Sequence, residues 1–163
     1  MDRLILLRHG KAEVDSASGR DFDRALTDRG RRDALIVAKA LEQAGVRPDV
    51  VLISPAARAA QTWEAVAEVF PGARVEQAPQ LYEISPDAIL ALAKSEGLTA
   101  RTVMVVGHNP GLGQLAAWLA QTAPAGAGKT RIVDGLPTAA AAVIGFAPSA
   151  FDLYTPRALG GGE

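Results

Sequence analysis

The chain has no cysteine and only two histidines in 163 residues, and its formal net charge is −1. Without cysteine there can be no disulfide, no thiolate metal site and no cysteine nucleophile. Two imidazoles are too few for a three-histidine zinc site. A balanced charge offers no basic excess to hold nucleic acid through its phosphates. We therefore expect no cofactor, no metal and no nucleic-acid partner.

Long apolar runs are also missing from the sequence. None approaches the ~18 residues that span a bilayer, and the apolar run at 4–7 is too short for a signal-peptide core. We therefore expect no membrane association and a cytoplasmic location. Apolar residues make up 48% of the chain and charged residues 21%, enough to bury the core of one domain. The expectation is a single domain over 1–163, with a flexible glycine-rich tail over 149–163.

Three short apolar runs do stand out, at Leu4–Leu7, Val50–Ile53 and Val103–Val106. Each is rich in Leu, Ile or Val and does not alternate with polar residues, which is typical of strands buried on both faces of a parallel sheet. A further strand is predicted over 139–146, and a weaker candidate lies at 74–77.

Helix signals lie between these runs. Thr27 has the place of an N-cap before a helix that ends near Gly45. Ser54-Pro55 predicts a helix from there to about 70, Ser85-Pro86 a helix up to Gly97, and Pro110 a helix to about 120. Strands that alternate with helices predict an α/β fold, a three-layer αβα sandwich with a largely parallel central sheet.

Polar residues follow the three apolar runs. Arg8, His9 and Gly10 follow the first, Arg58 lies shortly after the second, and His108 comes directly after the third. The carboxyl ends of parallel strands meet at one edge of a sheet, where ligands bind in open α/β folds. We therefore expect both histidines and both arginines to converge there.

Each of these residues also has a structural interpretation. A lone histidine is usually a hydrogen-bonded structural group, an arginine early in a helix is usually solvated, and the Gly-His-Asn-Pro-Gly run at 107–111 fits a turn. Taken together, two imidazoles and two guanidiniums form a cradle for an anion such as phosphate. A serine triad would need a G-x-S-x-G elbow, which is absent, so histidine is the remaining strong nucleophile.

Five segments resemble the histidine phosphatase superfamily, whose fold is phosphoglycerate-mutase-like. They are RHG at 8–10, RALTDRG at 24–30, SPAARAAQT at 54–62, GHNP at 107–110 and PT at 137–138. They follow the family's order and span nearly the whole chain. The short length, without a large insertion, looks most like the SixA-type phosphohistidine phosphatases.

This resemblance implies a role for each matching residue. His9 would be the nucleophile that is transiently phosphorylated, with a backbone carbonyl fixing its tautomer. Arg8 and Arg58 would bind the phosphoryl oxygens, and His108 would complete the pocket. No metal is implied, because arginines would neutralise the charge of the transferring group.

Three further residues are weaker candidates. Glu83 is the best match to the carboxylate with which larger family members protonate a leaving group, although it could equally support the following helix start. Gly10 and Asn109 are candidate substrate-binding residues, and Asn109 could instead support the arginines. The polar loop over 11–24 has a functional length but no assigned role.

The sequence thus predicts a phosphatase that works through a phosphohistidine intermediate. Its expected partner is a protein carrying phosphohistidine. The alternatives are a phosphatase for small phosphoesters in the same superfamily and a catalytically idle phosphate-binding regulator. A monomer is expected.

Overall fold

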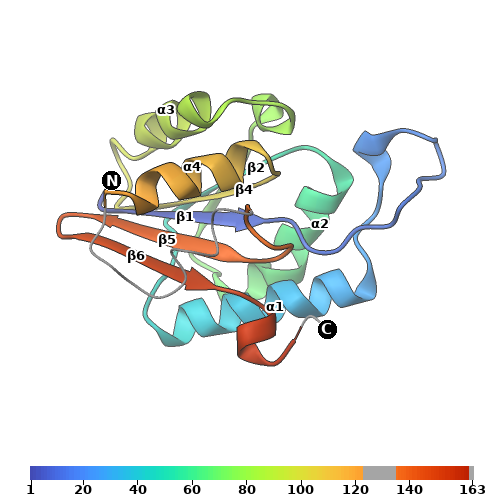
Figure 1. Ribbon diagram of the computed structural model, residues 1–163, viewed down its shortest axis with the longest axis horizontal. Helices are drawn as coiled ribbons and strands as arrows, with labels where there is room; N and C mark the ends of the chain where they lie inside the picture. Colours follow the sequence, from blue (N-terminus) through green and yellow to red (C-terminus); the bar gives the residue numbers. More distant parts are fainter. Residues whose placement is uncertain (123–134, 162–163) are drawn as a thin grey trace.

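The computed structural model describes residues 1–122 and 135–161. Its centre is a six-stranded sheet in the order β3-β2-β4-β1-β5-β6 (Figure 1). β1 pairs in parallel with β4, β4 with β2 and β2 with β3, whereas β5 is antiparallel to both β1 and β6. The strands are β1 (Arg3–Arg8), β2 (Val50–Ile53), β3 (Arg74–Gln77), β4 (Thr102–Gly107), β5 (Ala141–Phe146) and β6 (Ser149–Tyr154).

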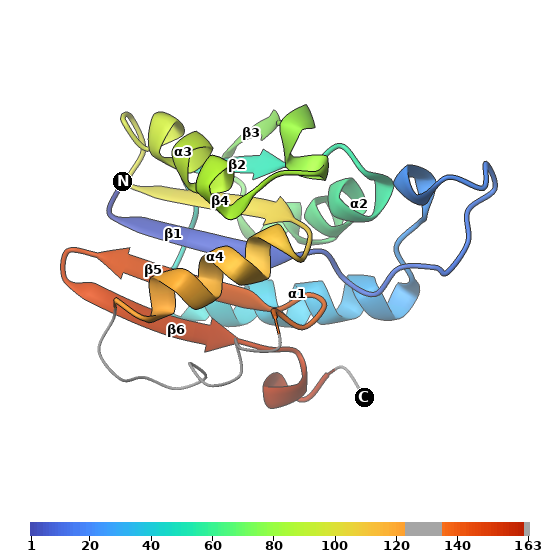
Figure 2. The same cartoon turned by 45° about the horizontal axis from the view of Figure 1, so that its top comes forward.

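Helices cover both faces of this sheet. α1 (Asp28–Gln43) and α2 (Ala57–Val66) pack on one face, and α3 (Pro86–Glu96) and α4 (Gly111–Ala120) on the other (Figure 2). Short 3-10 turns, η1 (Asp21–Asp23), η2 (Ala67–Val69), η3 (Pro79–Tyr82) and η5 (Arg157–Leu159), lie in the connections. The predicted three-layer αβα sandwich with a largely parallel sheet is confirmed.

The central strands are buried on both faces, as their unbroken apolar runs predict. In β1, Leu4 and Leu6 belong to the core under α3 and α4, whereas Ile5 and Leu7 belong to the core under α1 and α2. All six residues of β4 are buried. A strand that feeds two cores has no solvent face and therefore carries no polar alternation.

Two of the predicted helix starts are confirmed. The Thr27 side chain accepts a hydrogen bond from Gly30 N at 3.0 Å and caps α1, and Ser85 accepts one from Ala88 N and caps α3. Such caps satisfy amides that the first helical turn leaves without partners.

The predicted cap at Ser54 is wrong. α2 begins at Ala57 and ends at Val66, before the predicted end near Phe70, and its N-cap residue is Ala56. The Ser54 hydroxyl lies instead 2.6 Å from Nε2 of His108. The Ser54 side chain therefore makes a tertiary hydrogen bond to His108, whereas the local sequence pattern predicted that it would cap the helix.

The predicted flexible tail is also wrong over most of its length. Residues 149–154 form β6, which pairs with β5 along its whole length, and the turn η5 follows. The last two residues, 162–163, lie outside the described residues. In the ranges that the structure describes, no helix is long and apolar enough to cross a membrane.

Candidate active site

The carboxyl edge of the parallel strands holds the four principal residues predicted from the sequence. Arg8 ends β1 and His9 follows it, His108 follows β4, and Arg58 lies in the first turn of α2. The imidazole rings of His9 and His108 have centroids 5.2 Å apart. The topology predicts this meeting, because β1 and β4 are parallel neighbours that end level with each other.

His9 is buried, and its backbone neighbour fixes its tautomer. Its Nδ1 lies 2.7 Å from the carbonyl oxygen of Gly10. A carbonyl can only accept, so Nδ1 carries the proton and Nε2 keeps its lone pair. Burial lowers the pKa of His9 to about 3, and the nearby His108 and Arg8 act in the same direction. The ring is therefore neutral at pH 7.

His108 is held by a hydrogen bond at Nε2, whereas His9 is held at Nδ1. Nε2 lies 2.6 Å from the Ser54 hydroxyl, which is fully buried. Burial and, next, Arg58 lower the pKa of His108 to about 4, and Asp21 opposes the shift. Its Nδ1 is buried without a hydrogen-bond partner among the described residues.

Arg8 is anchored by a backbone carbonyl ahead of β5. One terminal nitrogen donates to Leu136 O at 2.8 Å, and the Asn109 side-chain amide donates to the same oxygen at 2.9 Å. The Asn109 carbonyl accepts from Gly113 N. Asn109 thus shares an acceptor with Arg8, an arrangement that favours the supporting role over direct substrate binding.

Arg58 is anchored by the loop after β1. Its two terminal nitrogens donate to the backbone oxygen of Asp21 at 2.9 Å and to its carboxylate at 3.0 Å. Thr62 donates to the Arg58 carbonyl and accepts from Gly10 N, which ties α2 to the segment that holds His9. The Gly10 amide and carbonyl are thus both engaged in positioning His9.

Three buried nitrogens around His9 have no hydrogen-bond partner in the described part of the chain. They are Nε of Arg8, Nε of Arg58 and Nδ1 of His108. Buried polar atoms are rarely left unsatisfied, because each costs desolvation free energy without return. Three such nitrogens around one neutral imidazole are suited to the oxygens of a bound phosphoryl group.

Asp21 and Tyr82 belong to the site although the sequence did not single them out. The Tyr82 hydroxyl donates to the Asp21 carboxylate at 2.7 Å, and the Tyr82 ring packs edge-on against His108 with centroids 5.8 Å apart. The hydrogen bond from Tyr82 lowers the pKa of Asp21 to about 2, and Arg58 adds to the effect. The feature of the sequence that pointed to Asp21 was the polar loop over 11–24, whose length is typical of functional loops. That length does not identify any particular residue.

A pocket of about 400 Å³ opens over these groups. Asp21, Arg58, Tyr82, Glu83 and His108 are among the residues that line it. Glu83 is exposed, and α3 is capped by Ser85 rather than by Glu83. Within the described ranges, no group of three or more His, Asp or Glu side chains is placed to hold a metal ion.

Comparison with known proteins places this chain in a family. The model of the histidine phosphatase superfamily, branch 1, matches residues 4–99. The chain belongs to the histidine phosphatase superfamily. The matched range includes Arg8, His9 and Arg58, and His108 lies beyond its end.

Relatives of this histidine phosphatase include proteins with the SixA name. It is 34% identical to the phosphohistidine phosphatase SixA of Escherichia coli over 122 residues, which is 72% of this chain and 73% of that protein. It is 35% identical to an uncharacterized chloroplastic protein of Arabidopsis thaliana over 127 residues, 72% of this chain, but spans only 58% of that protein's length.

Solved structures agree with this placement. A SixA-assigned structure from Agrobacterium tumefaciens superimposes with a TM-score of 0.80 at 30% identity, covering 95% of this chain and 98% of that one. A SixA structure complexed with tungstate gives a TM-score of 0.76 at 26% identity, covering 96% and 99%. The histidine phosphatase therefore has a SixA-like fold over nearly its whole length.

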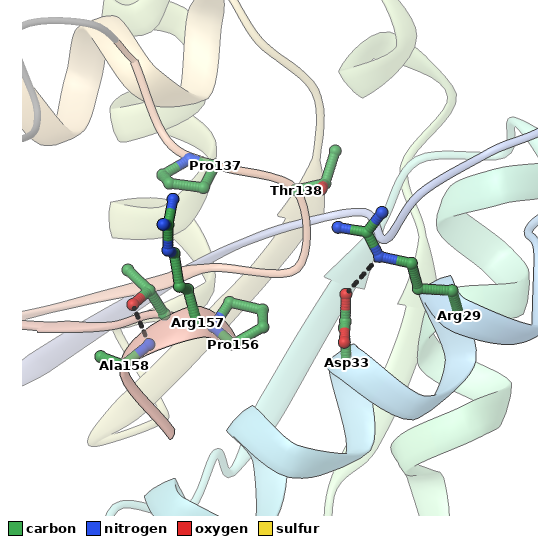
Figure 3. Close-up of a pocket in the computed structure, with 8 residues that line it drawn as sticks. Arg29, Asp33, Pro137, Thr138, Pro156, Arg157 and Ala158 are labelled. Carbon is green, nitrogen blue, oxygen red and sulfur yellow. Dashed lines mark hydrogen bonds and ion pairs between the residues drawn. The ribbon is translucent and has the colours of Figure 1, made fainter. Parts of the chain in front are cut away.

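A second, larger cavity of about 520 Å³ lies beside the start of α1 in this histidine phosphatase. The Arg29–Asp33 ion pair lies on one side of it and Arg157 on the other, near Pro137 and Thr138 (Figure 3). None of the residues predicted to carry chemistry lines it. The smaller pocket is lined by His108, whose ring lies against that of His9, and it is the candidate active site.

Proposed function

We propose that this chain is a SixA-type phosphohistidine phosphatase that removes the phosphoryl group from a phosphohistidine side chain of a partner protein. The proposal covers a single cytoplasmic domain over 1–163. The SixA name of a relative that matches 72% of the chain supports the substrate class. A short chain without a capping insertion leaves the pocket accessible to a side chain presented by another protein.

One observation carries the proposal. Nε of Arg8, Nε of Arg58 and Nδ1 of His108, all buried and without described partners, surround a neutral His9 whose Nε2 keeps its lone pair. This arrangement supplies a nucleophile and three donors for the oxygens of the group that the nucleophile attacks.

The reaction follows from these groups in two steps. Nε2 of His9 attacks phosphorus, a bond from nitrogen to phosphorus forms, and the bond to the leaving group breaks with its electron pair. Water then attacks phosphorus, a bond from oxygen to phosphorus forms, and the bond from nitrogen to phosphorus breaks with its electron pair returning to Nε2 of His9. Inorganic phosphate leaves, and the proton lost by the water passes to the phosphate or to solvent. The two guanidiniums spread over the equatorial oxygens and take the place of a metal as charge neutraliser, so we expect activity without metal.

The hydrogen bond between Ser54 and His108 bears on which ring nitrogen of His108 carries the proton. The Ser54 oxygen accepts from Ala56 N at 3.4 Å, and we propose that the serine donates its own proton to Nε2 of His108. Nε2 is then the acceptor, and the ring proton resides on Nδ1, which is the unpartnered nitrogen. A neutral His108 can therefore still donate to a phosphoryl oxygen.

The second candidate is a phosphatase for small phosphoesters. Glu83 favours it, because this carboxyl group lines the same pocket and an alkoxide leaving group needs a proton donor, whereas an imidazole needs less help. Under this alternative, Glu83→Gln slows phosphoenzyme formation from a phosphoester but leaves turnover of phosphohistidine nearly unchanged.

An activity panel tests the proposal. We expect kcat/KM for a phosphohistidine protein to exceed that for small phosphoesters, with activity retained in EDTA and inhibited by tungstate. His9→Ala serves as the inactive control. A preference for a phosphoester would favour the second candidate, and phosphate binding without turnover of any substrate would indicate an idle regulator. Inhibition by EDTA that added metal reverses would contradict the metal-free reaction.

A further inference from the structure

The turn η1 places a carboxylate at the wall of the phosphoryl pocket. One Asp21 carboxylate oxygen accepts from Arg58 at 3.0 Å and from the Tyr82 hydroxyl at 2.7 Å, and the other accepts from Arg24 Nε at 3.0 Å. The Asp21 side chain nevertheless remains 54% exposed and lines the pocket. Three segments thus fix a carboxylate that still has capacity to accept from a bound molecule.

The contact with Asp21 does not block the phosphoryl site. Arg58 uses its terminal nitrogens on Asp21, while its Nε is buried without a described partner. Arg8 Nε and His108 Nδ1 are in the same state. A phosphoryl group can therefore find three donors while Asp21 stays in place beside it.

The charges around the pocket match one kind of substrate. Arg58, Asp21 and Glu83 line the pocket, and the guanidiniums of Arg8 and Arg24 act on His108 from just behind this lining, so these five groups together carry one net positive charge. A phosphohistidine whose ring is protonated carries a dianionic phosphoryl group and a cationic ring, one net negative charge. A phosphoester dianion lacks the cation and leaves the site negative.

The chemistry of the bond from phosphorus to nitrogen explains why the ring charge matters. When this bond breaks, its electron pair returns to the ring nitrogen. If the distal nitrogen already carries a proton, taken up from solvent beforehand, the leaving group departs as neutral imidazole. If it does not, the leaving group is imidazolate, a much stronger base and a poor leaving group. A carboxylate beside the ring favours the protonated, reactive form.

We propose that Asp21 is a specificity-determining residue whose carboxylate accepts a hydrogen bond from the protonated distal ring nitrogen of a bound phosphohistidine, and so favours imidazole over alcohol leaving groups. This inference rests on the proposed function and adds to it a residue that selects the substrate class.

The neighbours of Asp21 keep its carboxylate charged. Arg24 faces it from its own turn, Arg58 from α2 and Tyr82 from η3, with Glu83 and His108 on the pocket wall. Through these contacts, first the hydrogen bond from Tyr82, the pKa of Asp21 falls to about 2. Asp21 therefore acts as a fixed anion over the working pH range and cannot serve as the proton donor that an alkoxide would need.

Asp21→Asn tests this inference, because it removes the charge and keeps a carbonyl oxygen for Arg58 and Tyr82. The substrates are a phosphohistidine peptide and p-nitrophenyl phosphate. We expect kcat/KM for the peptide to fall about tenfold to a hundredfold, the usual worth of a charged hydrogen bond, and that for the ester less than about threefold. Asp21→Glu, which keeps the charge, should retain most of the preference.

Asp23→Asn is the matched control. Asp23 lies in the same turn, is exposed, and accepts a hydrogen bond from Ser18 rather than from a pocket residue. We expect its rates on both substrates to match those of the parent protein. The pH profile gives a second measure: with the peptide, the alkaline limb of kcat, which reports the bound complex, should move to lower pH in Asp21→Asn, because the bound ring loses its proton more readily.

The other outcomes separate the two proposals. Equal losses on both substrates would show that Asp21 only positions Arg58, and gains on both would show that it competes with the phosphoryl group. No change on either would show that it has no part in turnover. Each of these results overturns the inference and leaves the proposed function standing. A parent protein that hydrolyses the ester but not the peptide would overturn the proposed function itself.

Discussion

At the residue scale, both imidazoles of the chain should titrate far below the ordinary range. Burial lowers the pKa of His9 to about 3 and that of His108 to about 4. Because these are the only histidines, ring nitrogen NMR reports them without interference. We expect both rings to stay neutral from pH 8 to pH 5, with Nδ1 protonated. A ring that titrates near 6.5, the usual histidine value, would contradict the buried arrangement.

The same neutrality sets the acid limit of the reaction. A protonated His9 cannot attack phosphorus, so the acid limb of kcat/KM for an ester substrate should lie well below pH 6.5, as far as folding permits. Asp21→Asn should leave this limb in place, because its carboxylate is not the nucleophile.

The phosphoenzyme is the second prediction at this scale. Rapid quench with labelled substrate should trap an adduct that is labile in acid and stable in alkali, as a phosphoramidate is, and the label should map to His9. His9→Ala should abolish label and turnover. His108→Ala should retain labelling but slow it about 10²–10³-fold, the usual cost of removing one transition-state donor. An acid-stable adduct on a serine would contradict these roles.

At the scale of elements, the packing of α1 against the segment after β1 is the feature to test. A Cβ added to Gly30 would meet the backbone oxygen of Lys11 and the Leu26 side chain. Because backbone cannot easily yield, we expect Gly30→Ala to lower stability by about 1–3 kcal/mol, a fall in Tm of roughly 3–10 °C, and to impair activity by shifting His9. Gly72→Ala, where a Cβ meets nothing within 4 Å, should leave Tm nearly unchanged.

The elements also show what the sequence could predict. β1, β2 and β4 are recognisable because burial on both faces forces unbroken apolar runs, and their parallel order then brings Arg8, His9, Arg58 and His108 together. β6 was missed because an edge strand has a mostly exposed, mixed sequence, SAFDLY, with Phe151 as its buried residue. Its place depends on pairing with β5, which no local pattern records.

The site divides in the same way. Residues that follow buried strands could be placed from topology. Asp21 and Tyr82 lie instead in the connections η1 and η3, and their meeting depends on the paths of these connections and on the directions of the two side chains, which the sequence does not predict. Ser54 was misread because its hydroxyl could satisfy either a helix amide or His108. The hydroxyl group can form a hydrogen bond with either partner, so the tertiary structure determines where the Ser54 side chain lies.

At the scale of the whole molecule, the neutral imidazoles make stability depend on pH. Both histidines bind a proton near pH 6.5 when unfolded but only near 3 and 4 when folded. Below pH 6.5 the unfolded chain therefore binds more protons, and the free energy of unfolding should fall as pH decreases from 6.5 to 4.5, by up to about 1.4 kcal/mol per unit for each ring. Urea titrations across this window measure the slope.

The variant His9→Gln/His108→Gln supplies the control for this slope. With both imidazoles gone, the free energy of unfolding should be nearly flat over the same window, since most carboxylates titrate lower. A slope that persists in the double variant would show that other groups cause it.

The carbonyl of Leu136 has a consequence for how the site can change by mutation. It accepts from both Arg8 and Asn109, yet every amino acid brings the same oxygen to that position, so no side-chain substitution deletes it. The buried Leu136 side chain is constrained by packing alone. Sequence variation at this position would therefore reflect only which side chains fit the core. The hydrogen bond to Arg8 would not appear in it, because all twenty amino acids have the backbone oxygen that accepts this bond.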